Sequence, residues 1–154
     1  MDRSINQIIA VIDTNVIVSA FLSSKQDTST VLVLEALYSD KIKILYSDEI
    51  INEYLDVLNR DKFKLDKNEV DRFIGFVVNN GIRVNPKESK GNLIDKKDQP
   101  FYDAMSVLEN TVLITGNIKH FPYEKKIMLP HDFINILYKK DKWYIINIIL
   151  YKMI

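Results

Sequence analysis

The apolar run Ile8–Ile12, which ends at Asp13, is the feature that most constrains the fold. Five consecutive apolar residues, most of them β-branched, predict a buried strand. This strand would deliver a carboxylate to its C-terminal end, followed by the small polar residues Thr14 and Asn15. In open α/β sheets that edge is where ligands bind. A carboxylate there has little structural use unless a cation or hydrogen-bond donors meet it, so Asp13 is a candidate functional residue.

Strands alternate with helices along the rest of the chain. The patterns predict further strands at residues 43–46, 82–84, 112–115 and 127–129, and helices at residues 28–39, 48–59, 67–80, 101–109 and 130–139. Capping signals support three of the helices: Ser47 as an N-cap, Asp66 with Glu69 as a capping box, and Pro100 in a first turn. The alternation predicts an α/β fold with a parallel sheet that helices cover on both faces.

Carboxylates are the most plentiful groups for chemistry in this composition. The 154 residues suit one domain, and basic and acidic residues are equal at 21 each, so bulk charge does not favour nucleic-acid binding. The absence of Cys excludes disulfides, thiolate zinc sites and Cys nucleophiles. With only His120 and His131, most His-based metal clusters are excluded and a Ser-His-Asp triad has little room. Carboxylate sites favour hard cations such as Mg²⁺ or Mn²⁺.

Neither end of the sequence carries a membrane signal. Residues 1–12 lack the basic start, long apolar stretch and cleavage site of a signal peptide. Residues 143–154 are strongly apolar, but a helix that spans a bilayer needs about 20 residues. We therefore expect no membrane association, and the absence of Cys suits the reducing cytoplasm.

Four further acids could converge on Asp13, and each has a structural alternative. Glu53 lies at the edge of the apolar arc of its predicted helix, where geometry alone slightly favours a surface role. Asp98 stands just before a predicted helix, where a capping role is ordinary. Asp103 lies among apolar residues inside that helix, and a structural role explains it less well. Asp95 has the surroundings of a solvated loop residue.

A second apolar strand also ends in small and polar residues, Thr115, Gly116 and Asn117. Asn117 could orient a water or bind a phosphate, although a turn residue is common after Gly. The order of these groups is more informative than any one of them. Two strand ends and two helices each place a carboxylate or amide where a parallel sheet would gather them. Carboxylates that lie close together repel, and a divalent cation removes that conflict.

This order of motifs resembles the PIN-domain family of metal-dependent ribonucleases. The matching segments are VIDTNVIVSA at residues 11–20, SDEIINEY at 47–54, DQPFYD at 98–103 and LITGNIKHFP at 113–122. The resemblance covers about residues 7–140. Within the family, the chain is similar to the branch of VapC-like toxin components of toxin–antitoxin systems. The first motif is moderately specific, the last is specific for this branch, and the ordered set is a strong signal.

The resemblance implies a three-layer α/β/α sandwich around a central, mostly parallel sheet, PIN-like and Rossmann-like. It also implies cleavage of single-stranded RNA that depends on Mg²⁺ or Mn²⁺. By position, the catalytic, metal-binding acids would be Asp13, Glu53, Asp98 and Asp103. Residues that support these acids or bind phosphate would be Thr14, Asn15, Ser47, Thr115 and Asn117. Many family members have Asp where this chain has Asn117, so a second metal site would lack one negative charge.

The implied reaction is in-line hydrolysis of a phosphodiester by water that the cation activates. Asp13 and Asp98 would hold the main cation. Glu53 would hold or orient the water, and Asp103 would complete the shell or a weaker second site. Nearby basic residues that could hold the RNA backbone are Lys96, Lys97, Lys119 and His120. A surface Lys is usually only solvated, and His120 beside Phe121 and Pro122 suits a structural turn better than catalysis.

The C-terminal segment departs from the family pattern. We expect a nuclease domain over residues 1–140 and an apolar extension over residues 141–154. If residues 143–151 were exposed they would be an aggregation hazard. We therefore expect the extension to pack on the domain, to add a strand, or to be buried in a homodimer or against a partner such as an antitoxin protein.

More than one function class stays open from the sequence. The leading hypothesis is a divalent-metal-dependent endoribonuclease that hydrolyses phosphodiester bonds in single-stranded RNA, as the toxin of a toxin–antitoxin pair. The alternative is a non-catalytic PIN-like module that binds RNA or a protein. A third, weaker interpretation is another magnesium-dependent phosphohydrolase on a similar sheet. The neutral net charge mildly favours a protein partner or a short RNA site over binding to long duplexes.

Overall fold

The computed structural model describes residues 7–89, 91–138 and 149–153. Within them, the strands are β1 (Ile8–Ile12), β2 (Ile42–Tyr46), β3 (Ile82–Arg83), β4 (Thr111–Ile114) and β5 (Ile127–Met128). They form one sheet in the order β3-β2-β1-β4-β5, and every neighbouring pair is parallel. The α-helices are α1 (Thr14–Leu22), α2 (Ser29–Tyr38), α3 (Asp48–Leu58), α4 (Lys67–Asn80), α5 (Gln99–Met105) and α6 (Pro130–Leu137).

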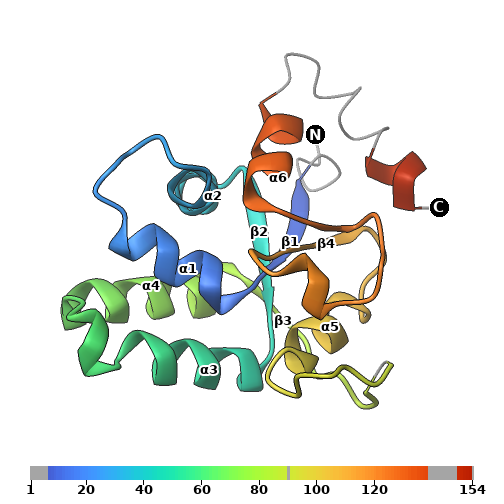
Figure 1. The fold of residues 1–154 in the computed structure, drawn as a ribbon, viewed down its shortest axis with the longest axis horizontal. Helices are drawn as coiled ribbons and strands as arrows, with labels where there is room; N and C mark the ends of the chain where they lie inside the picture. Colours follow the sequence, from blue (N-terminus) through green and yellow to red (C-terminus); the bar gives the residue numbers. More distant parts are fainter. Residues whose placement is uncertain (1–6, 90, 139–148, 154) are drawn as a thin grey trace.

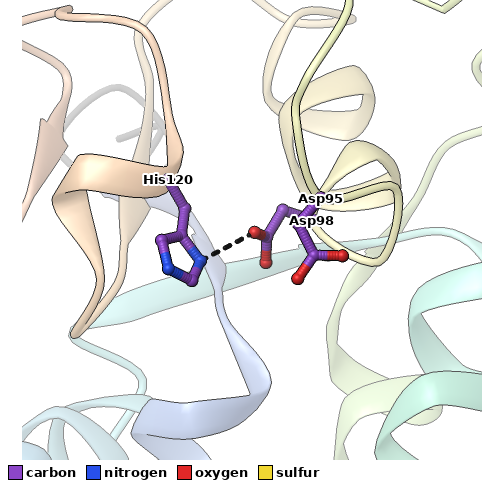
Figure 2. Close-up of side chains that lie close together, drawn as sticks. All are labelled: Asp95, Asp98 and His120. Atoms are coloured by element: carbon purple, nitrogen blue, oxygen red, sulfur yellow. Dashed lines mark hydrogen bonds and ion pairs between the residues drawn. The ribbon is translucent and has the colours of Figure 1, made fainter.

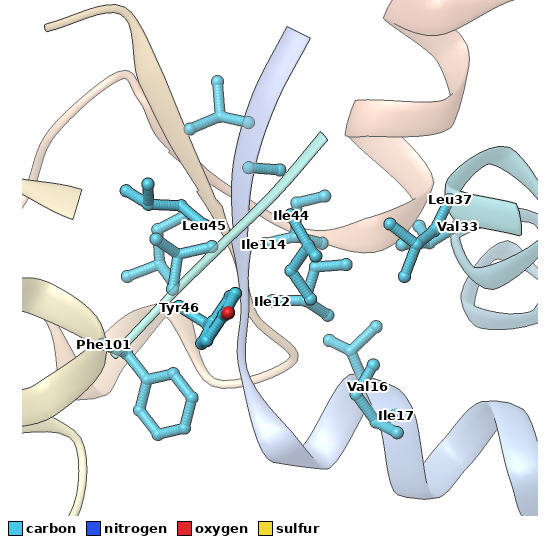
Figure 3. Packing of buried hydrophobic residues seen from close by; sticks show 14 of the residues in the cluster. Ile12, Val16, Ile17, Val33, Leu37, Ile44, Leu45, Tyr46, Phe101 and Ile114 are labelled. Atoms are coloured by element: carbon cyan, nitrogen blue, oxygen red, sulfur yellow. The ribbon is translucent and has the colours of Figure 1, made fainter. Parts of the chain in front are cut away.

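Helices cover both faces of the sheet, which confirms the predicted α/β sandwich. Helix α5 packs on β1, β2 and β4, whereas α2 contacts β2, α1 and α6. In Figure 1, α2 and α5 lie on opposite sides of the strands. Figure 3 shows the same arrangement in the core, with Phe101 of α5 on one side of the strands and Val33 and Leu37 of α2 on the other. Each large apolar side chain buried in this way contributes about 1.5–3 kcal/mol.

Helix α1 is the one long element that the sequence patterns do not predict. Its residues Val16, Ile17 and Val18 are β-branched, and such side chains lose rotamer freedom in a helix. Tertiary packing overrides this preference, because Val16 and Ile17 are each only 1% exposed. Since α1 begins directly after β1, Asp13 stands at the junction of the two elements.

The capping signals identify the starts of two helices correctly. The Ser47 hydroxyl oxygen accepts a hydrogen bond from the backbone nitrogen of Ile50 at 3.3 Å, which begins α3. The Asp66 carboxylate accepts one from the backbone nitrogen of Asn68 at 2.8 Å, which begins α4. These bonds satisfy backbone donors that have no partner within the helix.

Helix α5 is shorter than predicted and starts earlier. The sequence predicted a helix over residues 101–109, whereas α5 ends at Met105. The Ser106 hydroxyl donates to the carbonyl oxygen of Tyr102 at 2.9 Å, and such side-chain bonds compete with helix continuation. Asn110 then adopts a positive φ of 64°, which turns the chain into β4.

Part of the apolar C-terminal extension packs on the domain. Residues 149–153 are helical, Ile149 is 7% exposed within the core cluster, and Met153 packs against that cluster. The remainder of the predicted extension, residues 141–148 and 154, lies outside the described residues. The domain boundary at residue 140 therefore stays a prediction. None of the described helices has both the length and the apolar character needed to cross a membrane.

Candidate active site

The first predicted acid lies where β1 and β4 end side by side. These strands are parallel, with Ile12 opposite Ile114, so the residues that follow them are neighbours. The backbone nitrogen of Asp13 donates to the carbonyl oxygen of Ile114 at 2.9 Å. Thr115 Oγ1 donates to Asp13 Oδ2 at 2.8 Å. The strand register thus fixes the Asp13 carboxylate at the carboxyl edge of the sheet, where α/β folds bind ligands.

Asn15 ties this carboxylate to the turn that follows β4. Its Nδ2 donates to Asp13 Oδ2 at 3.1 Å, and its Oδ1 accepts from the backbone nitrogen of Gly116 at 3.0 Å. In the same turn, the backbone nitrogen of Asn117 donates to Thr115 Oγ1 at 3.0 Å. A Cβ added at Gly116 would lie 3.2 Å from Asn15 Oδ1, so a small residue suits this position. Asn15 and Thr115 therefore hold the acid in one orientation.

Burial makes Asp13 a weak acid for its type. The residue is 4% exposed, and desolvation raises its pKa from the usual 3.8 to about 6. The hydrogen bond from Thr115 opposes this rise, and the nearby charge of Asp98 adds to it. A positive charge in the cleft would stabilise the ionised form at neutral pH.

A cleft of about 730 Å³ opens at this sheet edge and contains three of the four predicted acids, Asp13, Glu53 and Asp98. Thr14, Asn15 and Asn117 line it as well, as the sequence led us to expect of residues that support the acids. Further lining residues are Val18, Ser19, Leu22, Ser23, Val57, Phe63, Asp95, Lys97, Phe101 and His120.

Helix α3 carries Glu53 to the cleft and is anchored next to it. Tyr54 is fully buried, and its hydroxyl donates to the carbonyl oxygen of Ile12, the residue before Asp13. Burial raises the pKa of Glu53, the charge of Asp56 raises it further, and Lys97 opposes both effects. Glu53 is therefore a partly buried acid facing a cleft, which suits proton transfer better than a fully solvated carboxylate does.

Asp98 stands at the start of α5, but its side chain makes no capping hydrogen bond. The capping role that would explain it structurally is therefore wrong. Its Oδ2 instead lies 3.0 Å from Nδ1 of His120, a contact drawn in Figure 2. Burial raises the pKa of Asp98, and the hydrogen bond with His120 opposes that rise.

Two predicted site residues, Asp103 and Ser47, line a different depression. Asp103 Oδ1 accepts a hydrogen bond from Gln99 Nε2 at 2.8 Å. The Ser47 hydroxyl is buried and caps α3. The structure thus does not bring these two side chains into the cleft of Asp13, and their roles at a metal site stay predictions.

The fold and the cleft geometry can be compared with known proteins. A family model described as "PIN domain" matches residues 9–119. The chain belongs to the PIN-domain family. No match was found among curated proteins or among solved structures. PIN domains are typically nucleases that use divalent metal ions, so membership indicates nuclease-type activity in general.

The cleft of this PIN domain has the donor set that a divalent cation requires. Asp13, Glu53 and Asp98 supply carboxylate oxygens, which hard cations prefer. Thr14 also lines the cleft, and its buried Oγ1 has no hydrogen-bond partner among the described residues. A buried hydroxyl without a partner costs about 1–3 kcal/mol. Rotation of this side chain toward a ligand in the cleft would remove that cost. The three carboxylates on one cleft fit a metal site.

Asp95 and His120 are cleft residues of the PIN domain that the sequence did not connect with Asp98 as possible ligands. The sequence predicts Asp95 as a solvated loop residue, and His120 as a basic residue near the acids that suits a structural turn; both are exposed. Yet their potential ligand atoms and one of Asp98 all lie within 4.8 Å of one another. The available signal was that His120 is one of two histidines and belongs to the motif after β4. Among the described residues, Asp13 and Glu53 do not form a three-membered group this close.

Proposed function

We propose that this PIN domain is an endoribonuclease that depends on Mg²⁺ or Mn²⁺ and hydrolyses phosphodiester bonds in single-stranded RNA. The observation that carries the proposal is the cleft at the carboxyl edge of the sheet. It gathers Asp13, Glu53 and Asp98 beside the unpartnered hydroxyl of Thr14. Burial raises the pKa of all three acids. Few structural roles explain three such acids on one cleft, whereas binding of a cation and a phosphate explains them.

Each acid has a separate task in this reaction. Asp13 and Asp98 hold the cation, and Asn15 and Thr115 keep the Asp13 carboxylate oriented for that purpose. When bound, the cation supplies activation of water and stabilisation of charge on the phosphate. Glu53 would orient the attacking water by a hydrogen bond and accept its proton, while the P–O bond to the leaving nucleotide breaks and the leaving oxygen takes a proton from solvent water.

The wall of the cleft supports an unpaired RNA substrate. Leu22 and Phe63 form an apolar surface beside the acids, with Leu22 51% exposed. Unstacked bases bind to aromatic and apolar side chains, whereas bases within a duplex are not available for such contacts. Lys97 lines the same cleft and can pair with a phosphate.

Cleavage assays on variants test the proposed roles. Asp98→Asn should reduce cleavage of a labelled single-stranded RNA by about 100-fold or more, because it removes a ligand of the cation. Asp71→Asn is the matched control, since it makes the same change at an exposed acid of α4 that does not line the cleft. Equal activity of wild type and Asp98→Asn would contradict the proposal. RNA binding without cleavage in any divalent metal would support a non-catalytic binding module instead.

We further propose that the protein is the toxin of a toxin–antitoxin pair. The resemblance of its motifs to that branch supports this. Expression in a bacterial host should arrest growth, and Asp13→Asn should relieve the arrest. Co-expression of a small protein from a neighbouring reading frame should relieve it for the wild type. Unimpaired growth despite wild-type protein that cleaves RNA in vitro would contradict the toxin assignment.

A further inference from the structure

Asp95, Asp98 and His120 approach one another from two separate segments. The two acids belong to the turn that leads into α5, and His120 closes the short 3₁₀ helix η3 (Ile118–His120) after β4. One ligand atom from each residue lies within 4.8 Å of the other two. Figure 2 shows both carboxylates and the imidazole ring facing the same small region.

The spacing of the two nearest atoms matches that of neighbouring ligands on one cation. His120 Nδ1 and Asp98 Oδ2 are 3.0 Å apart. Metal–ligand bonds of about 2.1 Å place adjacent corners of an octahedron about 3.0 Å apart. A cation bound to both atoms would lie beside the line that joins them, so the imidazole ring must turn toward the ion and the shared proton must leave to solvent.

The turn fixes Asp95 next to this pair. Asp95 Oδ1 accepts a hydrogen bond from the backbone nitrogen of Lys97 at 2.9 Å, and its carbonyl oxygen accepts one from the backbone nitrogen of Asp98 at 3.1 Å. The bond with Lys97 thus holds a second carboxylate beside the ion pair of Asp98 and His120. The charge of Asp95 repels that of Asp98, and a divalent ion between them reverses the effect.

Thr14 provides an independent indication that something binds in this cleft. Its side chain is 5% exposed, and its Oγ1 has no hydrogen-bond partner among the described residues. Thr14 lines the same cleft as Asp95, Asp98 and His120. Buried hydroxyls in folded proteins are nearly always hydrogen-bonded, and rotation of this side chain toward the cleft would give it a partner on a bound ligand.

We propose that Asp95, Asp98 and His120 form a mixed nitrogen and oxygen site for a divalent transition metal, which makes this PIN domain select Mn²⁺ over Mg²⁺. This proposal deepens the proposed function and rests on it, because RNA cleavage is what the bound cation would be for. Imidazole nitrogen suits first-row transition metals, most of all Fe²⁺, Ni²⁺, Cu²⁺ and Zn²⁺, and Mn²⁺ accepts it more readily than Mg²⁺, which prefers oxygen ligands alone. This ion would be the same cation that Asp13 and Asp98 hold in the proposed function, so Asp98 is a ligand in both descriptions and His120 adds a nitrogen that the carboxylates lack.

Pulsed electron paramagnetic resonance of Mn²⁺ bound to the full chain tests the nitrogen ligand directly. The wild type should show ¹⁴N coupling from a coordinated imidazole, and His120→Ala should lose it. His131→Ala is the matched control, because it changes the other histidine of the chain, which contacts Asn135 on α6. Absence of ¹⁴N coupling in the wild type, or its persistence in His120→Ala, would overturn the proposal.

Competition between the two metals tests the selectivity. His120→Ala should weaken Mn²⁺ binding by about tenfold or more and change Mg²⁺ binding much less. Asp95→Asn should weaken the binding of both metals and keep the ¹⁴N signal. Equal losses of Mn²⁺ and Mg²⁺ affinity in His120→Ala would contradict the proposal. Circular dichroism checks that these variants of exposed residues fold.

An RNA cleavage assay on the same wild-type protein separates the two proposals. Imidazole-bound Mn²⁺ without cleavage of any single-stranded RNA would sink the proposed function and leave the metal site standing. Cleavage with Mn²⁺ bound by oxygen ligands alone would sink the proposed metal site and leave the proposed function standing.

Discussion

Asp13 combines burial with three hydrogen-bond contributions, and the balance decides its charge. Desolvation raises its pKa to about 6 despite the bonds from Thr115, Thr14 and Asn15. This rise in the pKa corresponds to about 3 kcal/mol of folding free energy that is lost when the Asp13 carboxylate is ionised. Without a cation, the ionised carboxylate therefore destabilises the fold at neutral pH, and this strain favours cation binding.

The sign of this effect gives a pH prediction. Because the folded-state pKa of Asp13 is above its unfolded value of 3.8, the folded state binds more protons between pH 3.8 and about 6. The stability from this group is complete below pH 3.8 and is lost as pH rises through about 6. In metal-free buffer, Asp13→Asn should thus raise the free energy of unfolding at pH 7 by about 1–3 kcal/mol and not at pH 3.5. Urea denaturation at both values checks this, and parallel pH profiles would contradict it.

Three acids of the cleft could be predicted from the sequence, but two of their neighbours in the cleft could not. Asp13 follows an unmistakable strand, and Glu53 and Asp98 follow from motif order, so all three could be assigned before the cleft was known. Asp95 and His120 could not, because what joins them to Asp98 is the meeting of a turn with η3. The patterns of single segments carry no information about that distance.

Among the contacts between elements, the register between β1 and β4 is the one that positions the site residues. Asn15 of α1 bonds Gly116 after β4, and a larger residue at Gly116 would press on Asn15 Oδ1. Gly116→Ala should therefore disturb the orientation of Asp13 and weaken Mn²⁺ affinity by about tenfold. Gly75→Ala in α4 is the control, since its Cβ would contact nothing within 4 Å. The control should gain about 0.5–1 kcal/mol of stability with unchanged affinity in a metal titration. Equal affinities in both variants would contradict the account.

Ser47 is a predicted site residue that caps helix α3, and a substitution tests whether this capping is its whole role. Ser47→Ala should lower the free energy of unfolding by about 1 kcal/mol, because it removes the cap of α3. Thr28→Ala is the control, since Thr28 precedes α2 but makes no side-chain cap bond. Urea denaturation measures both, and Mn²⁺ affinity should stay at the wild-type level. A large loss of Mn²⁺ affinity in Ser47→Ala would instead restore the role at the metal site that the sequence suggested.

Whole-molecule architecture was predictable because strands and helices alternate with clear caps. The parallel sheet and its coverage by helices follow from that alternation, and residues 9–119 match the PIN-domain family. Helix α1 was missed because β-branched residues disfavour helices locally, and only tertiary packing decides otherwise. Local patterns predict that Asp103 lies inside helix α5 but do not say which cleft it lines, and in the structure it lines a different depression from that of Asp13.

Cation binding should be visible in the stability of the whole domain. An ion that binds only the folded state at 100 times its Kd adds about 2.7 kcal/mol. For a domain of this size, the corresponding rise in Tm is about 5–10 °C. Thermal melting with Mn²⁺ should show this rise for the wild type and a much smaller one for Asp13→Asn. Equal shifts in the two proteins would place the bound ion away from Asp13.

The central claim is that the acids of the cleft cut single-stranded RNA with a bound divalent cation. The most direct measurement is single-turnover cleavage of an end-labelled single-stranded RNA by wild type and Asp13→Asn, with Mn²⁺, Mg²⁺ or chelator, alongside RNA binding. We predict internal cleavage by the wild type with either metal, none with chelator, and a loss of about 100-fold or more in Asp13→Asn with RNA binding retained. Cleavage at the same rate by both proteins, or undiminished in chelator, would contradict the account.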